Sequence, residues 1–251
     1  MINVSRNNAV LKIEIDRPEK KNALVPQMYI DIAEAIESAS EEDINAVLIQ
    51  GTKGCFTAGN DISDFMSKGN DQDINETFRF MMALVNCPVP VVAKVEGLAI
   101  GIGTTLLLHC DFVYCADSAK FAMPFINLGL VPEYASSYIL PRIAGNLKAA
   151  ELLLLGETFS AQKAYECGIV TSVHTDETLS EVVAQTLAKL VAKPKMALVQ
   201  SKTLLRNQSA EIEKHISAEL AVFAQAMVSE PAKEAFSAFL EKRPVNRLIY
   251  K

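Results

Sequence analysis

The chain has 251 residues, half of them hydrophobic, so it is long enough to bury a substantial core as one large domain or as a domain with an appendage. A formal net charge of −6 argues against a nucleic acid or an anionic membrane as the partner, although it leaves room for a local basic patch that holds a small anionic ligand. The five cysteines include no CxxC pair, which is typical of a reducing compartment, and the three histidines lie too far apart to act together as zinc ligands.

The sequence carries no membrane or export signal that we recognise. Its longest apolar runs are shorter than the roughly 18 residues that span a bilayer, and residues 1–10 are too polar for a signal peptide. The C-terminal LIYK is not a peroxisomal address of the SKL type. We therefore expect a cytoplasmic protein with no metal, no nucleic acid and no membrane among its partners.

The first quarter of the chain reads as strand, helix, strand. Residues 10–15 alternate apolar and charged side chains, which predicts a half-buried strand that ends at Asp16–Pro18. Apolar residues recur at helical spacing over 26–39, with acidic residues on the opposite face. The continuous apolar run 46–50 predicts a buried strand, and 51–59 a loop.

The pattern then alternates between helices and strands before it becomes wholly helical. We predict a helix over 73–86, strands over 89–95, 112–115 and 169–173, and helices over 146–155 and 160–167, capped by Gly156 and Ser160. Such alternation indicates an α/β core. Helices predicted over 177–192, 194–206, 209–229 and 231–242 follow, so we divide the chain into a core, 1–193, and a helical C-terminal region, 194–251, that packs on the core or on another subunit.

A glycine-rich stretch at 97–103 connects the predicted strand 89–95 to a short apolar helix that ends at Asp111. Three glycines in seven residues indicate a backbone that approaches something closely. A strand, a tight turn and a helix N-terminus also aim backbone N–H groups at a partner with negative charge. A tightly packed core turn explains this segment alone equally well.

Two other segments look unusual for packing alone. The loop CFTAGNDISD, residues 55–64, ends in small residues and an Asn-Asp pair, and Asp61 suits a helix N-cap. In FINLGLVPEYASS, residues 125–137, Glu133 stands inside an otherwise uncharged and largely apolar run. Glutamate is usually solvated, but apolar surroundings would raise the pKa of its carboxyl and make it a usable general base near neutral pH.

Five motifs follow one another along the chain: DRPEKKNAL (16–24), FTAGNDI (56–62), GLAIGIG (97–103), LGLVPEYASS (128–137) and FSAQKAYECGIV (159–170). Together they resemble the enoyl-CoA hydratase/isomerase, or crotonase, superfamily. The resemblance extends over nearly the whole chain and implies a spiral of ββα units followed by an all-helical trimerisation region.

The resemblance implies an acyl-CoA thioester as substrate and no separate cofactor. The thioester oxygen, which becomes an enolate oxygen during the reaction, is held by two backbone N–H groups, expected here to be those of Ala58 and Ile102. Lys20, Lys21 and nearby Arg17 could attract the CoA phosphates, although a solvated basic turn is an equally good interpretation. Residues expected to line the CoA or acyl group are Lys21, Ala23, Leu24, Asn60, Asp61, Ile62 and Phe125.

The sequence departs from the hydratase pattern at the acid and base. The two positions that match the hydratase glutamates hold Thr105 and Phe125, whereas Glu133 matches the single catalytic glutamate of Δ3,Δ2-enoyl-CoA isomerases. The resemblance therefore implies an isomerase in which Glu133 moves a proton between C2 and C4. It also implies a homotrimer or a dimer of trimers.

Other functions stay open to different degrees. A hydratase or hydrolase of another acyl-CoA would use Glu133 toward water, and a non-catalytic acyl-CoA-binding homologue would have lost the chemistry. Serine-nucleophile hydrolysis is disfavoured because the chain has no GxSxG elbow. Dinucleotide binding is disfavoured because GLAIGIGTTL lacks the G-x-G-x-x-G order.

Overall fold

A computed structural model describes residues 1–39, 43–63 and 71–250, with the side chains of 71–74 outside the description. The main sheet has the strand order β1-β2-β3-β4-β6-β9. Only β1 and β2 pair antiparallel within it; the remaining neighbours are parallel. Its strands are β1 (Ile2–Asn7), β2 (Val10–Ile15), β3 (Ala46–Gly51), β4 (Val91–Val95), β6 (Phe112–Ala116) and β9 (Ser172–His174).

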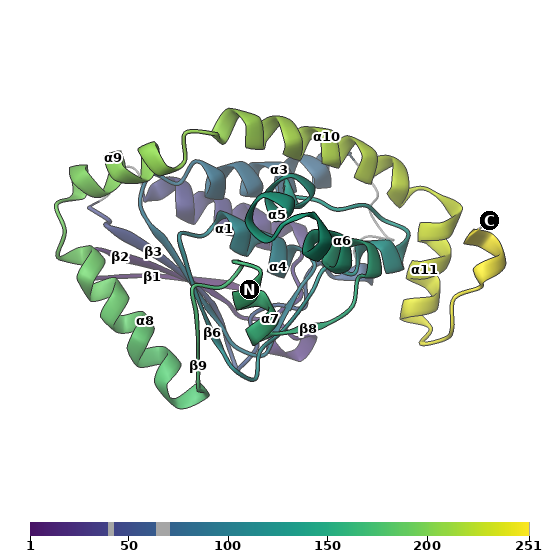
Figure 1. Ribbon diagram of the computed structural model, residues 1–251, viewed down its shortest axis with the longest axis horizontal. Helices are drawn as coiled ribbons and strands as arrows, with labels where there is room; N and C mark the ends of the chain where they lie inside the picture. The colour runs from purple at the N-terminus through teal and green to yellow at the C-terminus, as the bar shows by residue number, and fades with distance from the viewer. Residues whose placement is uncertain (40–42, 64–70, 251) are drawn as a thin grey trace.

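The sheet is covered on both faces, which explains why its central strands are mostly apolar (Figure 1). In β3, Val47 and Ile49 point into the larger core, whereas Ala46 and Leu48 point to the opposite face. That opposite face packs against α8 (Asp176–Val191). β2 instead alternates: its Leu, Ile and Ile side chains are fully buried, and the charged residues between them are half-buried.

The larger core lies between the sheet and helices α1 (Pro26–Ser38) and α3 (Asp71–Val85), which pack against each other. A second, smaller sheet has the order β5-β7-β8, formed by β5 (Leu98–Ile100), β7 (Lys120–Ala122) and β8 (Phe159–Ser160). It positions the glycine-rich stretch, because β5 begins directly after Gly97 and leads into α4 (Ile102–Thr105).

Short helical elements lie between the strands of the two sheets. They are the 3₁₀ helices η1 (Pro18–Lys20), η2 (Leu106–His109) and η3 (Phe125–Leu128), and the α-helices α5 (Ser136–Ala144), α6 (Asn146–Leu155) and α7 (Ala161–Glu166). The predicted caps are confirmed: Ser160 Oγ accepts from Lys163 N–H at 3.2 Å, and Gly156 follows α6 in the left-handed conformation, with φ 61°.

The C-terminal helices wrap around the core. In Figure 1, α9 (Lys195–Leu205) and α10 (Ser209–Met227) run along the top of the molecule, and α11 (Glu230–Leu240) descends at the right before η4 (Arg247–Tyr250). α10 contacts α3, and α11 contacts η3. The division of the chain at residue 193 stays a prediction.

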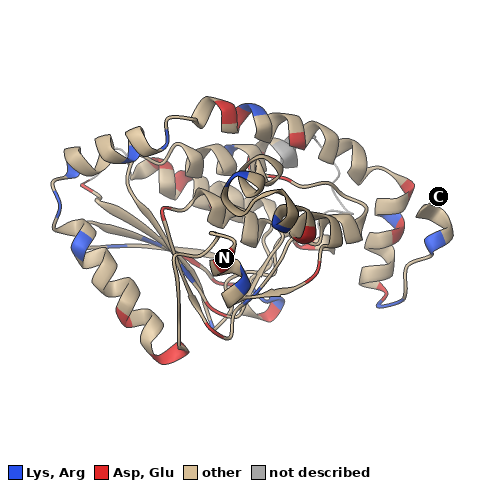
Figure 2. Cartoon of the chain, viewed as in Figure 1, with Lys and Arg blue, Asp and Glu red and all other residues tan. Residues whose placement is uncertain are grey.

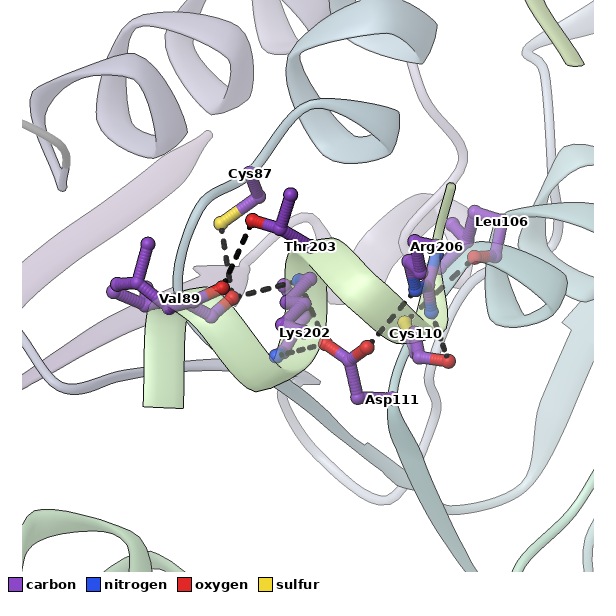
Figure 3. Close-up of polar contacts among 10 residues, drawn as sticks. Cys87, Val89, Leu106, Cys110, Asp111, Lys202, Thr203 and Arg206 are labelled. Carbon is purple, nitrogen blue, oxygen red and sulfur yellow. Dashed lines mark hydrogen bonds and ion pairs between the residues drawn. The ribbon is translucent and has the colours of Figure 1, made fainter. Parts of the chain in front are cut away.

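A buried ionic cluster fastens α9 to the main sheet (Figure 3). Lys202 Nζ lies 2.7 Å from Asp111 Oδ2 and donates to the Val89 carbonyl at 2.7 Å. Arg206 Nε donates to Asp111 Oδ1 at 3.0 Å, and the guanidinium also reaches the Cys110 carbonyl at 2.8 Å. Asp111 Oδ2 further accepts from Val91 N–H at 2.7 Å. The aspartate that ends the apolar segment 102–109 therefore joins β4, β6 and α9.

Most predicted elements are confirmed, including the α/β class and the four C-terminal helices. The predicted strand 169–173 is wrong in its bounds, because β9 begins only at Ser172. Ile169 and Val170 are buried in the larger core and do not pair in the sheet. The predictions missed β1, the smaller sheet and α5, which are short or lack a clear apolar period.

Lys and Arg lie on several separate elements rather than along one of them (Figure 2). Among the described residues, no helix is both long enough and apolar enough to cross a membrane.

Candidate active site

Two backbone segments run side by side at the centre of the site. Thr57 N–H donates to the Leu98 carbonyl at 2.8 Å, and Ile100 N–H donates to the Thr57 carbonyl at 3.1 Å. Glycine permits this approach: a Cβ on Gly59, where φ is 84°, would lie 2.5 Å from the Ile100 carbonyl oxygen, and one on Gly103 would lie 2.5 Å from a Thr57 methyl group. The glycines thus bring the loop after β3 against the turn that begins α4.

The backbone N–H groups of Asn60 and Ile102 are available in this arrangement. Ile102 is the first residue of α4, so its N–H has no intrahelical acceptor. Asn60 forms a parallel bridge with Leu24 in which Leu24 bonds to Gly59 and Asp61, so the Asn60 N–H points to the other side. Within 1–39, 43–63 and 71–250, no group accepts a hydrogen bond from either N–H.

The prediction that Ala58 supplies one of the donors is wrong in this structure. Its N–H already donates to the Lys21 carbonyl at 3.0 Å, which ties the loop to the basic turn. The next amide is also occupied, because Gly59 N–H donates to Thr57 Oγ1 at 3.0 Å. Asn60 is therefore the candidate donor in this loop, two residues later than expected.

Glu133 is a buried carboxyl, only 2% exposed. Burial raises its pKa to about 8; the hydrogen bond from Thr105 opposes this rise, and the charge of Glu219 adds to it. The Thr105 bond, from Oγ1 to Glu133 Oε1, is 2.9 Å long. Since Thr105 lies on α4 with Ile102, one short helix supplies both a free backbone donor and the partner of the carboxyl.

The backbone after Glu133 is strained. Tyr134 and Ala135 have φ of 60° and 55°, a left-handed conformation that costs a non-glycine residue about 1–3 kcal/mol. The surrounding core holds this turn in place: the Tyr134 hydroxyl donates to the Met81 carbonyl at 3.0 Å, and His109 Nε2 donates to the Tyr134 carbonyl at 2.8 Å. Burial lowers the pKa of His109 to about 3, so the ring is neutral.

Aromatic side chains lie beside the start of α4 and beside Asn60. Phe125 is buried, and its ring lies 3.9 Å from the position of a Cβ on Gly101, beside the start of α4. It packs edge-to-face on Phe223 of α10, with ring centroids 6.4 Å apart. The buried Tyr29 hydroxyl donates to Asn60 Oδ1; burial raises the pKa of Tyr29 well above its ordinary value, and the charge of Glu133 adds to the rise.

The residues expected near CoA form one connected region at the turn after η1. Ala23 and Leu24 are buried, whereas Lys21 is exposed. Asp61 lies 2.8 Å from Arg17, so the arginine is engaged in an ion pair. Burial raises the pKa of Asp61, but hydrogen bonds from Ser63 and Arg17 outweigh this effect and leave it below the ordinary value. Ile62 packs half-buried against the core.

Sequence reasoning missed several residues that shape this site. Tyr29 and His109 looked like ordinary core residues, and no sequence signal distinguishes them. At position 105 the sequence showed only that a hydratase glutamate is absent. The structure shows that the Thr105 hydroxyl donates to the Glu133 carboxyl. Nothing in the sequence connected Glu219 with the site. Among the described residues, no three His, Cys, Asp or Glu side chains are grouped so as to hold a metal ion.

Comparison with known proteins identifies the family of the chain. The family model described as enoyl-CoA hydratase/isomerase matches residues 5–247. The chain belongs to the enoyl-CoA hydratase/isomerase family. It is 42% identical to OdaA of Pseudomonas aeruginosa, whose solved structure it matches with a TM-score of 0.92 over 95% of this chain and 98% of that one. The crotonase fold expected from the motifs is thereby confirmed.

Named relatives fall on both sides of the isomerase–hydratase division. A mouse protein named "Enoyl-CoA delta isomerase 3, peroxisomal" is 38% identical over 72% of this chain, and the match spans 59% of its own length. A Mycobacterium bovis protein named "Probable enoyl-CoA hydratase echA8" is 32% identical over 96% of this chain and 95% of its own. Both names refer to enoyl-CoA, and neither decides between isomerisation and hydration for this chain.

Proposed function

We propose that the protein is a Δ3,Δ2-enoyl-CoA isomerase with Glu133 as its single acid–base group. The observation that carries this proposal is the Thr105–Glu133 hydrogen bond of 2.9 Å. Through this bond the carboxyl of Glu133 lies at the position that matches a hydratase glutamate, on the short helix that begins with Ile102. Phe125, at the other matching position, is buried and apolar. One carboxyl thus replaces two.

The N–H groups of Asn60 and Ile102 would receive the thioester oxygen. Glu133 takes a proton from C2 of a 3-enoyl-CoA, the electrons of that C–H bond move toward the thioester, and the oxygen gains charge that the two N–H groups stabilise. Glu133 then returns the proton to C4. The double bond shifts from C3–C4 to C2–C3 while the proton count stays unchanged. Losing one such donor typically reduces the rate by about 10²–10³.

The pKa of Glu133 suits a group that both takes and gives a proton. A carboxylate with a pKa of about 8 takes the C2 proton more readily than an exposed glutamate would, and its protonated form is still acidic enough to return that proton to C4. The apolar surroundings that raise this pKa, with Phe125 packed on Phe223, also keep water from the enolate. Both properties favour isomerisation over hydration.

The remaining features of the proposal concern ligand and assembly. The substrate is an acyl-CoA, bound without a further cofactor or metal, with Lys21, Ala23, Leu24, Asp61 and Ile62 bordering the CoA. Exposed apolar residues on the C-terminal helices, such as Leu204, Leu205 and Phe239, support assembly as a homotrimer or a dimer of trimers. Five free cysteines support a location in the cytoplasm.

The test replaces Glu133 by glutamine, which keeps the shape of the side chain and removes the acid–base group. Isomerisation of 3-hexenoyl-CoA should fall by at least roughly 10²-fold, because general acid–base catalysis contributes about 10²–10⁴. Glu157→Gln is the matched control, since Glu157 is exposed. Turnover by Glu133→Gln close to that of the control would refute the proposal.

Hydration of 2-enoyl-CoA is the second candidate. It is favoured by the likeness to the mycobacterial hydratase, which extends over nearly the full length of both chains. Crotonyl-CoA hydration faster than 3-hexenoyl-CoA isomerisation would make this the better description. Binding of acyl-CoA without exchange of C2 protons for deuterium would instead indicate a non-catalytic homologue.

A further inference from the structure

A second buried carboxyl, Glu219 of α10, lies against the turn that carries Glu133. Its Oε1 accepts from Ser137 N–H at 3.0 Å and also from the Ser137 hydroxyl. Its Oε2 is buried and has no hydrogen-bond partner among the described residues. Glu219 is only 9% exposed, and burying a carboxyl oxygen without a hydrogen-bond partner costs free energy of folding. Such a group in a folded protein therefore needs an explanation.

The position of Ser137 explains what this contact achieves. Ser137 is the second residue of α5, and the residue that caps this helix, Ala135, offers no side-chain acceptor. Glu219 therefore supplies from another helix the acceptor that the first turn of α5 lacks. Because Ala135 and Tyr134 are the strained residues, the carboxyl holds the C-terminal side of the strained turn.

The N-terminal side of the same turn is held by Glu133 itself. The Ser136 hydroxyl donates to the Glu133 carbonyl at 2.6 Å, and Ser136 N–H donates to it at 3.1 Å. Two adjacent serines thus connect the backbone of the base to the side chain of Glu219. Movement of α10 relative to α5 would shift Glu133 against Thr105 and the free N–H groups.

The two carboxyls also affect each other through charge. Burial raises the pKa of Glu219, although the Ser137 hydrogen bonds oppose the rise, and the charge of Glu219 contributes to the raised pKa of Glu133. Among the described residues, no cationic side chain contributes to the raised pKa of either carboxyl, although the charge of Arg206 reaches Tyr134 and His109. Tyr29 and Tyr134 have strongly raised pKa values and His109 a lowered one, so all three are neutral. Arg142 of α5 and His215 of α10 lie against the Tyr138 ring.

We propose that Glu219 is a positioning residue for Glu133: its carboxylate, bonded to Ser137, fixes the strained turn that carries the base. The C-terminal helix α10 is then part of the catalytic apparatus although it supplies no group that touches the reacting atoms. This inference rests on the proposed function, because it assigns Glu219 a role in a reaction that Glu133 performs.

Two variants separate the two effects. Glu219→Gln keeps an oxygen that accepts from Ser137 and removes the charge, whereas Glu219→Ala removes both. Glu213→Gln is the matched control, since Glu213 lies on the same helix and is exposed. For each variant, kcat and KM for 3-hexenoyl-CoA and the pH dependence of kcat/KM are measured, together with thermal unfolding to establish that the protein is folded.

We expect Glu219→Gln to keep a plateau rate within roughly threefold of wild type while the rise of kcat/KM with pH moves to lower pH by roughly half a unit. Loss of a like charge lowers the pKa of Glu133, so the base ionises earlier. Glu219→Ala should lower kcat by roughly 10–100-fold with little change in KM, because a small displacement of a catalytic group is costly.

Two results would overturn the inference. One is a pH profile of Glu219→Gln that coincides with those of wild type and Glu213→Gln. The other is a kcat of Glu219→Ala equal to that of wild type. These outcomes are distinct from failure of the proposed function, which is judged by Glu133→Gln alone. If Glu133→Gln is inactive and the Glu219 variants behave like the control, the isomerase proposal stands and Glu219 has no catalytic role.

Discussion

Replacing Thr105 by valine should make Glu133 a weaker acid and shift the activity to higher pH. Valine keeps the shape of threonine and removes the Oγ1–H that donates to Glu133 Oε1 at 2.9 Å. Hydrogen bonds to charged groups contribute about 1.5–3 kcal/mol, and the protonated carboxyl retains part of this. If the ionised form loses about 1.4 kcal/mol more than the neutral form, the pKa rises by roughly one unit.

The consequence for the rate follows from the fraction of Glu133 that is ionised. With a pKa of about 8 in the free protein, roughly a quarter of the molecules carry the ionised base at pH 7.5. A pKa near 9 reduces this to roughly 3%, so kcat/KM at pH 7.5 should fall roughly eightfold. Toward pH 9.5 the two proteins should converge, because both are then mostly ionised.

The assay is the pH dependence of kcat/KM for 3-hexenoyl-CoA, since this parameter reports ionisations of the free enzyme. Thr158→Val is the matched control, because Thr158 is exposed. A Thr105→Val profile that overlays wild type, or that moves to lower pH, would show that the Thr105 hydroxyl does not stabilise the ionised base. A uniform loss at every pH would point to a displaced Ile102 instead.

Two further predictions concern stability. The pKa of Glu133 is raised on folding from an ordinary 4.5 to about 8, so the stability that this group gives is present below pH 4.5 and is lost as pH rises to 8. Above pH 8 the free energy of unfolding of Glu133→Gln, measured in urea, should therefore exceed that of wild type by as much as roughly 5 kcal/mol. Urea midpoints of wild type and Glu133→Gln that differ by the same amount at pH 5 and pH 9 would contradict this reasoning. Asp111→Ala should destabilise the fold by about 3–5 kcal/mol in urea unfolding, because it leaves Lys202, 6% exposed, as a buried charge without its ionic partner. A decrease in the free energy of unfolding below about 1 kcal/mol, as for an exposed ion pair, would show that water solvates the Lys202 ammonium in place of Asp111.

The sequence was sufficient for the elements that carry their own periodicity. The strand 10–15 and the helix 26–39 follow from side chains that repeat at the spacing of each structure, and the structure has them as β2 and α1 with bounds equal or one residue shorter. α5 was missed because its nine residues include an internal proline and because its N-terminus depends on Glu219, a partner distant in sequence.

For the site, the sequence indicated a buried carboxyl but not the direction of each backbone N–H. The burial of Glu133 could be predicted because it is a lone carboxyl in an apolar run, and the structure buries it as expected. The donor in the loop could not, because the direction of an N–H depends on backbone pairing. The Ala58 N–H points to the Lys21 carbonyl, whereas the Asn60 N–H points away from Leu24. A pattern of letters does not distinguish those two directions.

The central claim is that one carboxyl, Glu133, moves the proton between C2 and C4. The most direct test incubates 3-hexenoyl-CoA in deuterated water with wild type, Glu133→Gln and the Glu157→Gln control, and follows both isomerisation and hydration of the product. We predict rapid formation of 2-hexenoyl-CoA with little hydration by wild type and the control, and loss of isomerisation in Glu133→Gln. Isomerisation by Glu133→Gln at the rate of the control would contradict the claim.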